Sequence, residues 1–151
     1  MYRIFAPLLF ISPTFAEMMV GMPNPWVDCE DLTQAEQIAG FNFSLNLENS
    51  KIRAMKNMIE IVYRIDNKRK IIIRKSLTSE NSDISGVYNK YPINETTQLK
   101  NGYELKIRGD KDKIYVANIN APDKAFSIYC EQGINEEELQ KICDFLVETN
   151  G

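Results

Sequence analysis

The sequence contains no histidine. This absence excludes Ser-His and Cys-His nucleophilic sites, the commonest general base near neutral pH and the commonest zinc ligand. The net charge of −3 is small, which argues against a nucleic-acid-binding chain and against a strongly acidic tail. We therefore expect no cofactor, no metal and no nucleic-acid partner.

Cysteine is scarce, and its number is odd. With Cys29, Cys130 and Cys143, at most one disulfide can form within the chain, and one thiol is left over. If the chain is exported, a bridge between Cys29 and Cys130 is the first choice. Cys143 falls on an apolar helical stripe, where a thiol usually behaves as a small buried hydrophobe.

The amino terminus carries the pattern of an export signal. Arg3 supplies positive charge, residues 4–11 are mostly apolar, and Thr14-Phe15-Ala16 places small residues before a cleavage point. The apolar run is shorter than the about 20 residues that span a bilayer, so we expect no transmembrane segment.

The domain boundaries follow from this pattern. We assign residues 1–16 to a signal peptide, 17–25 to a leader and 26–151 to a single domain, which is long enough to form one hydrophobic core. The predicted location is periplasmic or extracellular. The alternative is a cytoplasmic protein translated from a later start at Met18, Met19 or Met22.

Residues 59–65 and 71–75 are rich in β-branched side chains and flank a polar segment, which predicts a β-hairpin. Because strand side chains alternate between faces, a loop of odd length gathers the isoleucines of both strands on one face. We therefore predict an odd loop of three or five residues. In the three-residue version, Glu60 lies opposite Arg74. The isoleucine face needs a cover, and the other face is expected to stay in contact with water.

Two helices are predicted at opposite ends of the domain. The first has capping-box spacing between Thr33 and Glu36 and ends at Gly40. The second begins at the N-cap Asn135, where Glu138 completes a capping box. Its apolar stripe consists of Leu139, Ile142, Cys143 and Leu146.

Alternating apolar and polar residues predict further extended segments. One is residues 41–47, and three more, 103–108, 114–119 and 125–130, form an antiparallel meander. An even loop between the last two would place one set of side chains on a common face: Tyr115, Ala117, Ile119, Phe126, Ile128 and Cys130. Residues 77–97 are expected to form a long irregular loop.

The order of these elements predicts the fold class. The order is helix, strands, irregular loop, strands and helix, and it indicates an α+β fold. We expect a single antiparallel sheet of about five or six strands, with two helices packed on one face.

Segments along nearly the whole chain follow a recurring order and spacing: residues 22–26, 38–41, 58–63, 73–75 and 83–86, then Tyr88, Tyr91, 127–129 and Gly133. In these segments the chain resembles a family of small secreted or lipoprotein bacterial domains of unknown function. The resemblance implies an exported location and an α+β fold. It implies no activity, because that family has no assigned reaction or ligand.

Two groups of residues are candidate binding sites. The hairpin sets six cations against Asp66, and such a cluster could hold an anionic polymer, a lipid surface or an acidic partner; the cations are Arg64, Lys68, Arg69, Lys70, Arg74 and Lys75. The alternative is a solvated edge whose lysines prevent aggregation. In the irregular loop, Tyr88 and Tyr91 are either exposed contact residues or packed back onto the sheet.

The function that these features favour is a non-enzymatic, exported binding or interaction module for an envelope component or a partner protein. One alternative is a small secreted enzyme that works without histidine chemistry. The other is a cytosolic regulator made from a later start.

Overall fold

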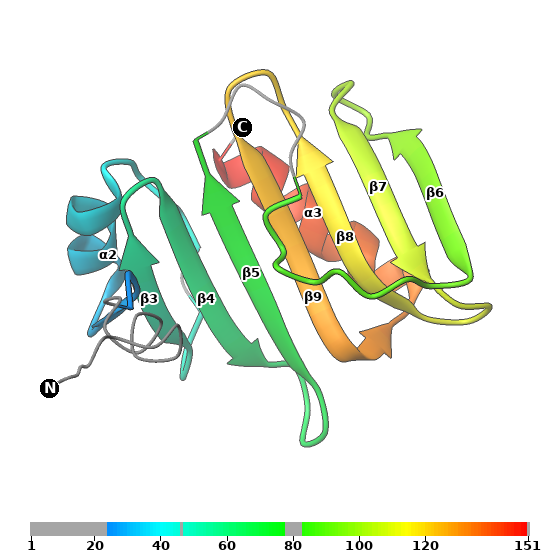
Figure 1. Ribbon diagram of the computed structural model, residues 1–151, viewed down its shortest axis with the longest axis horizontal. Coiled ribbons are helices and arrows are strands. Elements are labelled where there is room, and N and C mark those ends of the chain that lie inside the picture. Colours follow the sequence, from blue (N-terminus) through cyan, green and yellow to red (C-terminus); the bar gives the residue numbers. More distant parts are fainter. Residues whose placement is uncertain (1–23, 46, 78–82, 151) are drawn as a thin grey trace, which may run out of the picture.

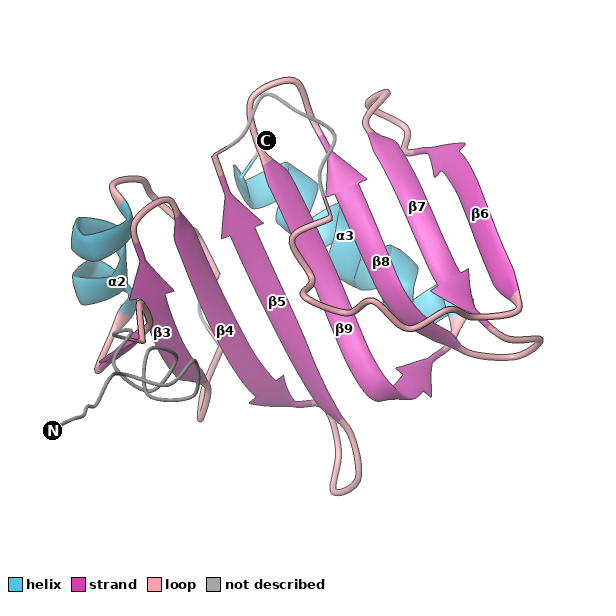
Figure 2. Ribbon diagram, in the orientation of Figure 1, coloured by secondary structure: helices cyan, strands magenta, loops and turns pink. Residues whose placement is uncertain are grey.

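The computed structural model describes residues 24–45, 47–77 and 83–150. They form one eight-stranded antiparallel sheet and two helices (Figures 1 and 2). The strand order is β2-β3-β4-β5-β9-β8-β7-β6. The predicted signal peptide and nearly all of the leader lie outside the described residues.

The element bounds, in chain order, are β2 (Val27–Cys29), α2 (Leu32–Ala39), β3 (Lys51–Met55), β4 (Met58–Arg64), β5 (Lys70–Ser76), β6 (Ile93–Gln98), β7 (Glu104–Gly109), β8 (Ile114–Asn120), β9 (Ala125–Ile134) and α3 (Glu136–Asn150). The predicted α+β class is confirmed. The predicted number of strands is wrong, because the sheet has eight strands and not five or six.

Three short or polar strands account for most of this difference. β2 has only three residues, and β3 is separated from β4 by a tight turn at Lys56 and Asn57, where Asn57 has φ 70°. β6 lies within the segment predicted to be irregular. Conversely, the described residues of the segment predicted at 41–47 include the buried Phe43 and Leu45, as expected, but residues 41–45 and 47 do not pair as a strand.

The β4–β5 hairpin has the predicted register. Arg64 pairs with Lys70 around a five-residue loop, and Glu60 lies opposite Arg74. Ile61 faces Ile73 in the same ladder. The odd loop therefore gathers Ile59, Ile61, Ile71 and Ile73 on one face, while Ile72 lies on the other.

That face forms the hydrophobic core, and α3 lies behind it in Figure 1. Buried side chains of both helices and of the sheet belong to one hydrophobic cluster, which includes Ala35, Ala39, Ile59, Ile61, Ile71, Ile73, Leu139, Cys143 and Leu146. Phe43, from the unpaired segment after α2, joins it against Phe126, with ring centroids 6.3 Å apart. No helix in the described part of the chain is both long and apolar enough to cross a membrane.

The helix ends show two confirmed caps and one corrected cap. At α3, the Glu138 N–H donates to Asn135 Oδ1 at 2.8 Å and the Asn135 N–H donates to Glu138 Oε1 at 3.0 Å, which is the predicted capping box. At α2, the N-cap is Asp31 and not Thr33, because Asp31 accepts from the Gln34 N–H at 2.8 Å. Gly40 ends α2 in the left-handed region, as predicted.

The β8–β9 turn has the predicted even loop, with Asn120 opposite Ala125. Ala117 and Ile119 accordingly face the core together with Ile128. Tyr115 departs from the prediction, because the ladder shifts register between Ile114 and Val116. Tyr115 stacks instead on Tyr91.

All three cysteines are free thiols, so the expected Cys29–Cys130 disulfide is not formed. Cys29 lies in β2 and Cys130 in β9, with β3, β4 and β5 between them. Four strand spacings place these cysteines roughly 19 Å apart. A disulfide needs Cα atoms within about 7 Å.

The face opposite α3 is here called the open face. Around Glu60 it is less exposed to solvent than predicted. This carboxylate is 3% exposed and accepts hydrogen bonds from Arg53 Nη2 at 3.1 Å and from Arg74 Nε at 2.9 Å. Trp26 covers both guanidinium groups, which lie 4.3 Å (Arg53) and 5.1 Å (Arg74) from its ring centroid. The hairpin's cross-strand pair is thus part of a buried charge network.

We expect Glu60→Gln to lower the free energy of unfolding by about 2–4 kcal/mol, because two covered guanidinium groups lose their counter-charge. The matched control is Glu95→Gln on the exposed strand β6, for which we expect a change within about 0.5 kcal/mol. Urea denaturation measures both values. Equal, small effects of the two substitutions would contradict the buried network.

Candidate functional site

A hollow on the open face crosses β6, β7 and β8. Leu105, Ala117 and Ile119 point into the core, so the residues that alternate with them point to the opposite side. These side chains and Asp83 line a hollow of about 340 Å³, here called the polar groove: Asp83, Asn94, Thr96, Lys106, Arg108, Asn118 and Asn120.

Two asparagines at the base of the polar groove have unsatisfied side chains. Asn118 is 4% exposed and Asn120 is 7% exposed, and the side-chain oxygen of each has no hydrogen-bond partner in the described structure. A buried acceptor left without a donor destabilises a protein by about 1–3 kcal/mol. Such groups are rare in native proteins and call for an explanation. A ligand that donates hydrogen bonds would supply one here once the amides turn these oxygens toward the groove, because less than 1 Å² of each oxygen is accessible as it lies.

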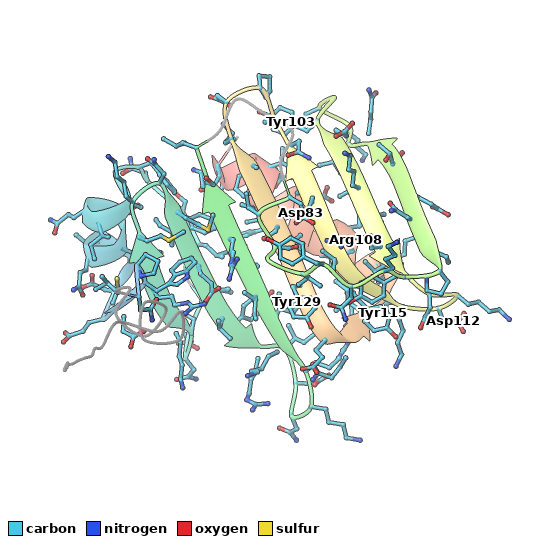
Figure 3. All side chains as sticks on the ribbon, viewed as in Figure 1. Asp83, Tyr103, Arg108, Asp112, Tyr115 and Tyr129 are labelled. Carbon is cyan, nitrogen blue, oxygen red and sulfur yellow. The ribbon has the colours of Figure 1, made fainter. Side chains whose placement is uncertain are left out.

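The polar groove adjoins a second hollow of about 410 Å³ through their shared residue Asn120. Tyr103 and Pro122 supply apolar surface to this second hollow, and Glu104 supplies a carboxylate. Lys106 Nζ lies 3.8 Å from Glu104 Oε1. Figure 3 shows Tyr103 near the ends of β7 and β8, away from Arg108.

Residues 83–92 cross the open face in front of β9, β8 and β7 (Figure 1). Arg108 holds this segment by donating to the Val87 carbonyl at 2.9 Å and to Asp83 Oδ2 at 2.7 Å (Figure 3). Arg74 adds a bond to the Ile84 carbonyl at 3.0 Å. Two arginines of the sheet therefore fix the wall of the polar groove.

The two predicted tyrosines have different environments. Tyr88 is 84% exposed, whereas Tyr91 is half-buried and stacks on Tyr115 with ring centroids 5.1 Å apart. Tyr88 therefore fits the expected exposed contact residue, whereas Tyr91 packs against the sheet.

The structure separates the six cations of the hairpin. Lys75 points to the core, where it is buried beside Phe41 and Phe43 and donates to the Asn42 carbonyl at 2.8 Å. This burial lowers the pKa of Lys75. Arg74 lies on the open face with Glu60. The six cations therefore do not form one continuous patch.

At the hairpin loop, Arg69 binds the carboxylates of Asp66 and Glu138, each at 2.8 Å. The remaining cations, Arg64, Lys68 and Lys70, are exposed. Whether this reduced tip binds an anion stays a prediction.

Sequence reasoning missed the polar groove because polar residues that alternate along a strand resemble an ordinary solvated face. One signal was present in β8, where Asn118 and Asn120 interrupt an otherwise apolar strand. Within the described ranges, no group of three or more His, Cys, Asp or Glu side chains could hold a metal ion.

We expect Arg108→Met to release the segment that crosses the open face. The N–H groups of Ser85 and Val87, which bond within this segment, should lose about tenfold or more of their protection from hydrogen exchange. The matched control is Lys106→Met, which removes a neighbouring cation from the same strand. Unchanged protection in Arg108→Met would show that the arginine does not fix the segment.

The pairing of Glu138 with Arg69 predicts a pH dependence. The Arg69 hydrogen bond, helped by the Asn135 N–H, lowers the pKa of Glu138 from its ordinary value of 4.5. A carboxylate whose pKa is lower in the folded state stabilises the protein above its unfolded pKa and loses that stabilisation as the pH falls through its folded pKa.

We therefore expect Glu138→Gln to lower the free energy of unfolding at pH 7 by about 1–2 kcal/mol. The variant should also lose less stability than the wild type when the pH falls below about 4.5. Glu137→Gln, in the same helical turn, is the control. Parallel stability–pH curves for wild type and Glu138→Gln would contradict the assignment.

Comparison of the chain with models of known families, with curated proteins and with solved structures found no match. The resemblance to small secreted domains therefore stays a prediction, and the function is argued from the geometry of the polar groove.

Proposed function

We propose that the chain is a non-enzymatic binding module that holds a hydroxyl-rich polymer, of the saccharide class, in the polar groove. The observation that carries this proposal is the pair of buried asparagine oxygens without partners, Asn118 and Asn120. Both lie on the same strand two residues apart, which separates them by about 7 Å. A sugar chain presents hydroxyl donors at several points along its length and can satisfy both oxygens once the two amides turn them toward the groove.

The other groups that line the polar groove suit the same ligand. Thr96 can donate to and accept from a hydroxyl group. Lys106, whose side chain is 46% exposed, offers a cation for an acidic substituent on the polymer. In the adjoining hollow, the ring of Tyr103 offers an apolar face to a sugar ring.

The charged groups of the polar groove support binding more than catalysis. Asp83 and Arg108 pair with each other at 2.7 Å, and this pair builds the wall. The remaining charge is Lys106, with Glu104 as its nearest carboxylate. General acid–base chemistry needs a titratable group that is free to exchange a proton with the substrate. Amide and hydroxyl groups instead supply a fixed set of hydrogen bonds.

Export is part of the proposal. It is supported by the amino-terminal pattern of residues 1–16. In this proposal the ligand is an envelope polymer, and we expect Lys106 to favour polymers that carry acidic groups.

A partner protein is the second candidate ligand. The observation that favours it is the large exposed ring of Tyr88, which lies on the segment held by Arg108. Exposed tyrosines often anchor protein interfaces.

The test of the proposed function measures binding of tetrasaccharides by calorimetry, using tetramers of glucose, of N-acetylglucosamine and of a uronic acid. We expect Asn118→Ala and Asn120→Ala to weaken binding by about tenfold or more, because each removes an acceptor for the ligand. The same substitutions should leave the thermal stability unchanged or raise it, because each removes an unsatisfied buried group.

The control is the double variant Lys68→Glu/Lys70→Glu at the exposed hairpin tip, for which we expect unchanged binding. Loss of binding in this control, with full binding by the asparagine variants, would move the site to the hairpin. If no tetrasaccharide binds and Tyr88→Ala abolishes capture of a partner protein, the second candidate is correct.

A further inference from the structure

β6 is a weakly protected edge of the sheet. It is the outermost strand and pairs only with β7, over six residue pairs with no shift in register. Five of its six residues are exposed. Natural edge strands are usually protected by charged side chains, above all lysine, by proline, by a bulge or by short length. The sequence Ile-Asn-Glu-Thr-Thr-Gln has none of these except the single charge of Glu95. The opposite edge, β2, is only three residues long.

We propose that β6 pairs antiparallel with β6 of a second copy of this chain, with the two-fold axis at Thr96. In antiparallel pairing, residues directly opposite each other share a face, so the axis of a symmetric pair must pass beside a residue. An axis at Glu95 would place two carboxylates opposite each other, which is unfavourable. An axis at Thr96 pairs Asn94 with Gln98, Glu95 with Thr97 and Thr96 with itself.

The apolar residues near the two ends of β6 also match each other in this register. The same pairing brings Ile93 of one copy opposite Leu99 of the other, on the core side of the sheet. Both side chains are half-buried, and Leu99 packs against the hydrophobic cluster. The second copy would cover them. Because a single pair of strands buries less surface than a standard interface, we expect a weak, concentration-dependent dimer.

The pairing has a consequence for the polar groove. Asn94 and Thr96 belong to its lining, and the two-fold axis keeps the open faces of both copies on the same side. The two grooves would therefore adjoin across the axis and offer one longer site. The proposed strand pairing depends only on the exposed edge strand β6, whereas the joined site also depends on the proposed function of the polar groove.

The test is sedimentation velocity of the full chain from about 1 µM to about 1 mM, with two opposite substitutions at Thr97. Thr97 is exposed, and it lies opposite Leu105, on the face away from the polar groove. Thr97→Glu places a carboxylate opposite Glu95 of the other copy and should weaken the dimer about five- to tenfold. Thr97→Lys places an ammonium group there and should leave the dimer as tight or make it tighter.

The charge-swapped variant Glu95→Lys/Thr97→Glu should restore the wild-type dimer. A wild-type chain that stays monomeric over the whole range would overturn the pairing. Equal changes of dimer affinity in Thr97→Glu and Thr97→Lys would also overturn it, provided that both variants unfold at the wild-type temperature. Tetrasaccharide binding is measured separately. A monomeric chain that binds saccharide overturns the dimer and leaves the proposed function intact.

Discussion

The structure depends on the register of the central β4–β5 hairpin, in which Glu60 lies opposite Arg74. Strand side chains alternate strictly between faces, so a shift of one residue would turn Ile61 and Ile73 away from the helices. With this register, one face is apolar and covered by α2 and α3. The other face carries charged and polar side chains such as Glu60, Arg74 and Asn118, although Lys75 lies on the core face.

The open face is organised by arginines that reach out of the sheet. Arg74 and Arg108 bind backbone carbonyls of the segment that crosses this face, and they hold it against the strands. Between this segment and the outermost strand, no element described in the structure fills the space above Asn118 and Asn120. The same interactions that close one part of the open face therefore leave the polar groove beside it.

Much of the core could be predicted from local patterns, because alternation and capping are properties of short segments. Asn135 with Glu138 is an example, since both bonds form within one helical turn. β6 was not predictable in this way, because both of its faces are exposed and it lacks apolar alternation. Burial of Lys75 and the polar groove depend on segments far apart in the chain, which a single sequence does not bring together.

The most direct test of the binding site is a titration with an N-acetylglucosamine tetramer, followed by nuclear magnetic resonance of the asparagine side-chain amides. The account predicts that the signals of Asn118 and Asn120 shift and saturate together, while the backbone signals of Lys68 and Lys70 stay in place. Saturable shifts at the hairpin tip, with the two asparagine signals unmoved, would contradict it.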